Sequence, residues 1–194
     1  MKNTQYIEYR NAIEKIVSIS NQVWNDIEEE LNFSSLQKDE YFSKENQYLK
    51  KIGFICRGIL RIFYLDDNGN EWNKHFLTKN DFVAESINPY KKSITNIQAL
   101  NNTEIIYLDF NKFKELSEKH SSLKTFMQKL TYNYLEQKEK REINFMSNTS
   151  IENYKLFKEK YPNLENEISQ YHIASYLSIT PTQLSRIRKK MKNI

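Results

Sequence analysis

The sequence predicts an α+β fold, in which a segment of short strands is followed by one long helix and a small helical region. Residues 40–108 hold short runs rich in Ile, Phe, Tyr and Thr that are broken by turn residues. Residues 121–146 follow a helical apolar pattern without Gly or Pro. Residues 169–191 hold two shorter helical patterns that are separated by a turn.

The first part of the chain is predicted to form two helices and then a β-rich domain. Helical spacing of apolar residues predicts helices at 5–17 and at 20–32. Asn68-Gly69 supplies the positive φ angles of a tight hairpin turn. Short strands at this spacing are typical of a sandwich or a barrel. The expected strands are 40–44, 52–57, 59–65, 71–77, 82–87, 94–100 and 103–108.

The long helix carries an apolar seam formed by Leu123, Met127, Leu130 and Tyr134. At 1.5 Å per residue the segment would be a rod of about 39 Å. A rod of that length either packs on its own domain or pairs with a second copy of itself. We favour pairing, because the rest of the helix is polar. These four residues are therefore the predicted dimer contacts.

The polar residues 147–150 mark the clearest domain boundary. The sequence predicts a β-barrel domain at 1–120, a dimerisation helix at 121–147 and a helical domain at 148–194. In the last domain a helix is expected at 151–161, with Ser150 as its N-cap.

The segment 169–191 has the pattern of a helix-turn-helix, in which two short helices are locked together by shared apolar contacts. Thr180 and Gln183 form a Thr-x-x-Gln capping box for the second helix, and Pro181 suits its first position. Ser178 occupies the turn position that Gly commonly holds, so a left-handed backbone is expected there. The inner faces are formed by Ile173, Ala174, Leu177, Leu184, Ile187 and Met191.

The net charge of +4 is concentrated at the end of the chain. Residues 180–194 contain five basic residues and no acidic one. Such a patch attracts a polyanion, although a solvated basic tail is the alternative. Combined with the helix-turn-helix, it predicts binding of double-stranded DNA rather than a helical hairpin that binds nothing.

The outward face of the second helix is predicted to read bases through Thr182, Ser185, Arg186 and Lys189. Arg186 can donate two hydrogen bonds to guanine O6 and N7 in the major groove. Contacts to phosphates position a protein without reading the sequence. The residues expected to make them are Ser169, Gln170, Thr180, Arg188, Lys190 and Lys192.

Composition argues against several other classes of protein. No apolar run approaches the roughly 20 residues that cross a membrane, and the first residues contain no apolar signal segment. The single cysteine, Cys56, excludes an internal disulfide and a multi-cysteine metal site. His75, His120 and His172 fall on different expected elements. We therefore expect a cytoplasmic protein without a metal site, a cofactor or enzymatic activity.

With these elements in order, the chain resembles the Crp/Fnr family of bacterial transcription regulators. The barrel segment Ile55-x-x-Gly58-x-x-Arg61 and the Asp-Asn-Gly hairpin are similar to the family's strands. The run from Ile173 to Arg188 is similar to its helix-turn-helix. The resemblance implies a double-stranded β-helix (jelly-roll) sensor barrel and a homodimer that pairs through the long helix. It also implies a palindromic operator, RNA polymerase as a further partner, and Arg186 as the base-reading arginine.

The resemblance does not extend to the cyclic AMP site. Residues 82–86 stand where cyclic AMP binders have Gly-Glu-Leu, and only Glu85 matches, as the one candidate effector contact. The phosphate-binding arginine is missing near Ser93, where Lys91 and Lys92 can act only as point charges. The effector is therefore unknown, and cyclic AMP is not expected to bind. The sequence ends at Ile194, so the helical domain is expected to lack a full wing.

Two other functions remain open from the sequence. A small-molecule-binding protein would bind its ligand in the barrel, and its helical C-terminus would not bind DNA. An enzyme of the cupin type would need clustered His and carboxylate ligands on neighbouring strands, and the sequence does not supply them.

Overall fold

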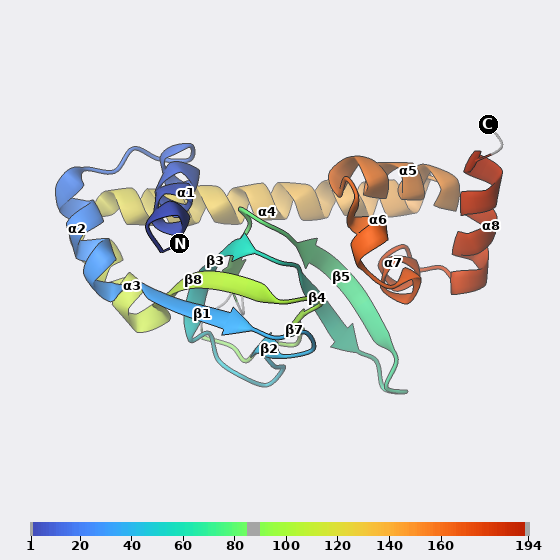
Figure 1. The fold of residues 1–194 in the computed structure, drawn as a ribbon, viewed down its shortest axis with the longest axis horizontal. Helices are drawn as coiled ribbons and strands as arrows, with labels where there is room; N and C mark the ends of the chain where they lie inside the picture. Colours follow the sequence, from blue (N-terminus) through green and yellow to red (C-terminus); the bar gives the residue numbers. More distant parts are fainter. Residues whose placement is uncertain (1, 85–89, 193–194) are drawn as a thin grey trace. The chain divides into compact units, whose positions relative to one another are not determined.

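The computed structural model describes residues 2–84 and 90–192, and it has the mixed α+β fold that the sequence predicts (Figure 1). Two helices, α1 (Lys2–Glu14) and α2 (Asn21–Glu30), precede the strands. The strands are β1 (Asn32–Leu36), β2 (Tyr41–Ser43), β3 (Lys51–Arg57), β4 (Leu60–Leu65), β5 (Glu71–Leu77), β6 (Phe82–Ala84), β7 (Asn96–Ala99) and β8 (Thr103–Asp109). They form two sheets, in the orders β1-β8-β3-β6 and β2-β7-β4-β5.

The pairings β1–β8, β3–β8, β3–β6 and β2–β7 are antiparallel. Strand β1 was not predicted, because most of its residues are polar or only partly buried and it lacks an apolar alternation. Its partner β8 is buried along much of its length. An edge strand of this kind is formed by its pairing with a neighbour more than by its own sequence pattern.

Two apolar cores lie on the two faces of β3, and for this reason β3 is buried along most of its length. Ile55 contacts a cluster that includes Leu60 of β4 and Ile97 of β7, which places this core between the two sheets. Phe54 belongs to the other core, which is covered by α1, α2 and the helices that follow β8. The alternation of side chains along a strand sends neighbouring residues to opposite faces.

Gly58 joins β3 to β4 and is required by both conformation and space. Its φ is +99°, which L side chains rarely adopt, and a Cβ there would lie 2.4 Å from the Oγ1 atom of Thr103. The glycine in the barrel motif is therefore explained by the close approach of the loop before β8.

A hairpin turn joins β4 to β5 as predicted, but only Gly69 has a positive φ, of +79°, and Asn68 does not have the positive φ that was expected of it. Asp66 holds the turn, because its carboxylate accepts hydrogen bonds from the backbone N–H groups of Asn68 and Asn70. It also accepts one from the indole of Trp72. These bonds, above all the one from Trp72, lower the pKa of Asp66 to about 2.

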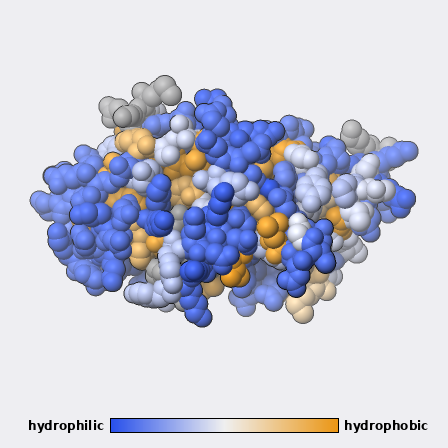
Figure 2. All heavy atoms as spheres, turned by 90° about the horizontal axis from the view of Figure 1, so that it is seen from below, coloured by the Kyte–Doolittle hydropathy of each residue, from blue (hydrophilic) through white to orange (hydrophobic). Residues whose placement is uncertain are grey.

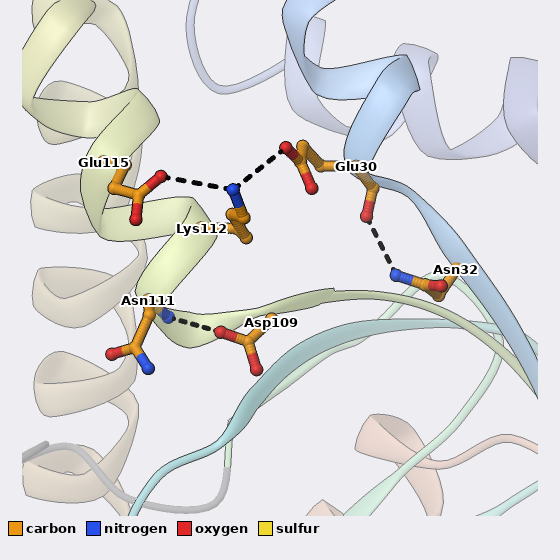
Figure 3. Close-up of polar contacts among 6 residues, drawn as sticks. All are labelled: Glu30, Asn32, Asp109, Asn111, Lys112 and Glu115. Atoms are coloured by element: carbon orange, nitrogen blue, oxygen red, sulfur yellow. Dashed lines mark hydrogen bonds and ion pairs between the residues drawn. The ribbon is translucent and has the colours of Figure 1, made fainter.

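Helix α3 (Phe110–Lys119) follows β8 directly, and the carboxylate of Asp109 caps it by accepting from the backbone of Asn111 at 2.8 Å. Lys112 pairs with Glu115 at 3.4 Å and with Glu30 at the end of α2 at 3.5 Å (Figure 3). These ion pairs are exposed, so they contribute little stability but connect the ends of two helices.

Helix α4 (Ser121–Ser147) is the predicted long helix, but its predicted dimer seam is directed at the protein's own core. Leu123 is 1% exposed within the core that covers β3, and Met127 and Leu130 pack against the same core. Tyr134 is partly buried. Leu123 therefore has almost no exposed surface left for pairing with a second copy, because periodicity identifies an apolar stripe without identifying what covers it.

The chain divides into two compact units. One contains residues 1–62 and 76–133, and the other contains the hairpin residues 63–75 with residues 134–194. In the second unit α4 is followed by α5 (Ser150–Lys160), α6 (Leu164–Glu167), α7 (Gln170–Tyr176) and α8 (Pro181–Lys192). No local pattern in the sequence indicates that the hairpin groups with the C-terminal helices.

The cap of α5 is Thr149 and not Ser150 as predicted. Thr149 and Glu152 form a complete capping box, with the Glu152 carboxylate accepting from the backbone of Thr149 at 2.7 Å. The acidic partner three residues later fixes the start of the helix, and Ser150 has no such partner. None of the helices in the described ranges is long and apolar enough to cross a membrane. The face shown in Figure 2 is mostly hydrophilic, with small apolar patches.

Candidate nucleic-acid interface

Helices α7 and α8 are locked together by the apolar residues that the sequence predicted. Ile173, Ala174 and Leu177 are buried on the first helix and at its end, and Leu184 and Ile187 are buried on the second. Leu184 has no exposed surface, so the direction of α8 is fixed by packing. Met191, near the end of α8, is partly buried.

The turn between the helices adopts the expected left-handed conformation, with Ser178 at φ +55°. The backbone N–H of Ile179 returns to the carbonyl of Ala174 at 3.0 Å, and that of Leu177 donates to Ile173 at 3.0 Å. These bonds satisfy carbonyl groups at the end of α7. The turn is therefore closed with serine in the place of glycine.

The capping box of α8 is formed as predicted. The backbone N–H of Gln183 donates to the Thr180 hydroxyl at 3.1 Å, and the backbone N–H of Thr180 donates to the Gln183 side chain at 2.9 Å. Ser169 caps α7 by accepting from the backbone of Tyr171 at 3.2 Å. Both helices thus start at positions fixed by side-chain hydrogen bonds.

The predicted base-reading residues form one exposed row on α8. Thr182, Ser185, Arg186 and Lys189 are all exposed. At about 100° per residue, they lie on the side of the helix opposite Leu184 and the other buried residues. The row is therefore held outward by the same packing that locks the two helices.

The predicted phosphate contacts differ in how exposed their side chains are. Ser169, Gln170, Thr180 and Lys190 are exposed at the start of each helix or beside the base-reading row. Lys192 is the last residue of α8, and its side chain lies outside the described part of the structure. The sixth residue, Arg188, has a different environment.

Arg188 is partly buried and lies close enough to Tyr154 to lower its pKa. The net pKa of Tyr154 is still raised to about 12, first by burial and then by its hydrogen bond to Glu165. Arg188 therefore lies near Tyr154 of α5 within its own unit, a proximity that the sequence pattern of α8 did not indicate.

The β4–β5 hairpin contacts α7 through a set of hydrogen bonds that sequence reasoning missed. The Ser175 hydroxyl accepts from the backbone N–H of Asn73 at 2.9 Å and donates to the carbonyl of Glu71 at 2.8 Å. The Asn73 side chain also donates to the carbonyl of His172 at 3.2 Å. The signal in the sequence was an asparagine within an expected strand, because an amide that becomes buried there needs hydrogen-bond partners.

The candidate effector residue Glu85 lies outside the described residues. In the barrel, Arg61 is 4% exposed and its guanidinium donates to the Gln98 side chain at 2.8 and 2.6 Å. No group of three or more His, Cys, Asp or Glu side chains able to hold a metal ion occurs among the described residues. His120 instead pairs with Asp26 at 2.7 Å, and this contact lowers the pKa of Asp26.

Comparison with known proteins identifies the fold. Residues 33–120 match the family described as the cyclic nucleotide-binding domain. No curated protein matches the sequence. Three solved structures illustrate the similarity.

FixK2 from Bradyrhizobium japonicum has 16% identity and a TM-score of 0.75, over 84% of this chain and 85% of that one. A protein from Eubacterium rectale assigned to the Crp/Fnr family of transcriptional regulators has 14% identity and a TM-score of 0.72, over 90% and 84%. The c-di-GMP responsive regulator CLP from Xanthomonas campestris has 11% identity and a TM-score of 0.67, over 90% and 92%. Residues 33–120 therefore resemble the cyclic nucleotide-binding domain, and the chain as a whole has the fold of the solved Crp/Fnr transcription regulators.

Proposed function

We propose that this protein is a DNA-binding transcription regulator of the Crp/Fnr type and not an enzyme. The observation that carries the proposal is the exposed row Thr182, Ser185, Arg186 and Lys189 on α8. The helix that bears it is fixed by buried Leu184, and it contains basic residues but no acidic one. A rigid helix with a polar, basic outer face is suited to the major groove.

We further propose that residues 1–120 act as the sensor, 121–147 as the dimerisation helix and 148–194 as the DNA-binding domain. Two copies would present two α8 helices to a palindromic operator, about one DNA turn apart. RNA polymerase would then be the protein through which such a regulator acts.

The dimer contact that we propose is an exposed stripe on α4 formed by Tyr132, Leu135, Ile143 and Met146. These side chains are 66%, 45%, 55% and 83% exposed. At about 100° per residue they fall within an arc of about 80°, on the side opposite Leu123 and Leu130. Exposed apolar side chains in register along a long helix favour a second helix as their cover.

The test of DNA recognition compares Arg186→Ala with Lys190→Ala in a salt titration on operator and random duplexes. Arg186→Ala is expected to cost about 1–3 kcal/mol on the operator and little on random DNA, because a base contact is lost. Lys190→Ala is expected to weaken both alike and to reduce the salt slope by about one unit. Lys158→Ala, at an exposed position on α5, is the matched control. An equal loss on both duplexes for Arg186→Ala would show that Arg186 contacts only phosphate.

Cyclic AMP is not the effector in this proposal, despite the name of the domain family. Where the family motif has a phosphate-binding arginine, this chain has the region around Ser93. The Ser93 side chain is buried, and its hydroxyl donates a hydrogen bond to the carbonyl of Thr95. Titration calorimetry with cyclic AMP is expected to give no binding in the micromolar range. Binding at that level would place the nucleotide on residues that the sequence motif does not identify.

A further inference from the structure

Four basic side chains lie together in the unit that contains the hairpin and the C-terminal helices. We call them the basic cluster: Lys74 of β5, Lys138 and Arg141 of α4, and Lys160 of α5. None of them belongs to the exposed row on α8 or to the basic residues after 180. Their elements are separated in sequence, so only the fold of this unit brings them together.

Aromatic contacts join the elements that carry the basic cluster. Arg141 lies 4.5 Å from the ring centroid of Tyr176 and donates to the carbonyl of the same residue at 2.9 Å. The rings of Tyr176 and Tyr161 are 5.9 Å apart, and the Tyr161 hydroxyl lies 3.2 Å from His75 Nδ1. His75 follows Lys74 in β5, so this chain of contacts leads from α4 through α7 and α5 to the hairpin.

A second contact connects α5 to α4 directly. The Nζ atom of Lys160 donates to the side chain of Gln137 at 3.2 Å, and Gln137 precedes Lys138. Lys160 also lies over the ring of Tyr161 at 5.4 Å. The charges of Lys138 and Arg141 act on Lys74, and those of Lys160, Arg141 and Lys74 act on His75, so the four cations lie near one another.

The electrostatics of this region are unfavourable as the protein stands. Burial lowers the pKa of Lys74, and the charges of Lys138 and Arg141 lower it further. His75 is partly buried, and its pKa falls to about 3, first through burial and then through Lys160, Arg141 and Lys74. Lys74 and Arg141 are partly buried, and like charges close to such positions oppose one another unless an anion compensates them.

The described part of the chain supplies no such anion to two members of the cluster. Lys74 and Lys138 form no ion pair with any described carboxylate. The buried Nε atom of Arg141 has no hydrogen-bond acceptor among the described residues. A buried donor without an acceptor is uncommon in folded proteins and points to a missing partner.

We propose that the basic cluster binds a multivalent oxyanion, such as the phosphoryl group of a small molecule, between the hairpin, α4 and α5. Arginine and lysine together are the usual ligands of phosphate, through directed hydrogen bonds and point charges. Lys74 and Arg141 are partly buried, whereas backbone contacts to a duplex are expected from exposed side chains beside α8. A bound oxyanion would connect the hairpin to the helices that carry the DNA-binding face.

The test uses inorganic pyrophosphate as the probe, titrated into the full chain by calorimetry without DNA. Saturable binding is expected for the unaltered protein. Lys138→Gln, at an exposed position, is expected to raise the dissociation constant about tenfold, and Lys74→Gln with Lys138→Gln further. The matched control is Lys155→Gln with Lys158→Gln, at exposed lysines of α5 outside the cluster, which should leave the constant within about twofold.

The absence of saturable pyrophosphate binding to the unaltered protein would overturn the proposal. Equal binding to the Lys138→Gln and control variants would also overturn it. If pyrophosphate does not bind and Lys138→Gln weakens operator binding, the cluster is instead a contact for the DNA backbone. The calorimetry contains no DNA, so failure of the proposed DNA-binding function would not affect this outcome.

Discussion

The two halves of α4 both carry apolar side chains, but the surroundings of these side chains differ. In the first half, Leu123 and Phe126 are buried in the core of their own unit. In the second half, Leu135, Ile143 and Met146 remain exposed. Both groups are apolar and follow helical spacing, so periodicity alone does not separate a core from an interface. The difference lies in whether another element of the same unit covers the helix at that point.

The largest effect is expected from Leu123→Ala, which tests the buried half of this comparison. Removing a side chain from a closed core should lower the free energy of unfolding by about 2–5 kcal/mol. Urea denaturation followed by tryptophan fluorescence, to which Trp24 of the same core contributes, measures it. Met146→Ala is the control and should change stability by less than about 0.5 kcal/mol. If Leu123→Ala weakened only self-association, the assignment of the two faces would be reversed.

Leu135→Glu with Ile143→Glu tests the exposed half. The change should raise the dimer dissociation constant about 100-fold, equivalent to about 2.8 kcal/mol, because apolar contact is lost and like charges are brought together. The folded protomer should persist, since both side chains are exposed. Sedimentation measures the effect, and Asn133→Glu, exposed but outside the stripe, is the control. A stable monomer for the unaltered protein would remove the proposed interface.

His75 is a polar side chain that is partly buried in the structure. Its pKa is about 3 in the folded protein and about 6.5 in the unfolded chain. The unfolded state therefore binds the proton first, and stability falls as the pH decreases below 6.5. The loss between pH 8 and pH 5 should be at most about 2 kcal/mol.

Replacing His75 with Gln should flatten this part of the stability profile while keeping a polar partner for Tyr161. Denaturation at a series of pH values measures the slope for both proteins. An unchanged slope in His75→Gln would assign the acid sensitivity to other groups.

The smallest effect is expected at the start of α8. Thr180→Ala removes the hydroxyl that accepts from Gln183, at a cost of about 1 kcal/mol. Hydrogen exchange of the α8 amides should report the loss locally. Thr182→Ala, exposed on the same helix, should leave exchange unchanged. Equal effects of both changes would indicate that helix propensity and not the cap is being measured.

The sequence by itself determined the parts of this protein that depend on local rules. The hairpin turn with a left-handed Gly69, the Thr180 capping box and the spacing of Leu184 and Ile187 each depend on a few neighbouring residues, and the structure has all three. Backbone conformation and side-chain alternation depend on residues within this short range, so they can be predicted without knowledge of the tertiary structure.

Only the tertiary structure decided which surfaces are covered. It placed Leu123 in a core, brought Arg188 near Tyr154 and attached the hairpin to α7 through Asn73. It also collected the basic cluster from three elements that are separated in the sequence. Each of these outcomes depends on contacts between distant segments, and burial, pairing and charge crowding are properties of those contacts and not of the local pattern.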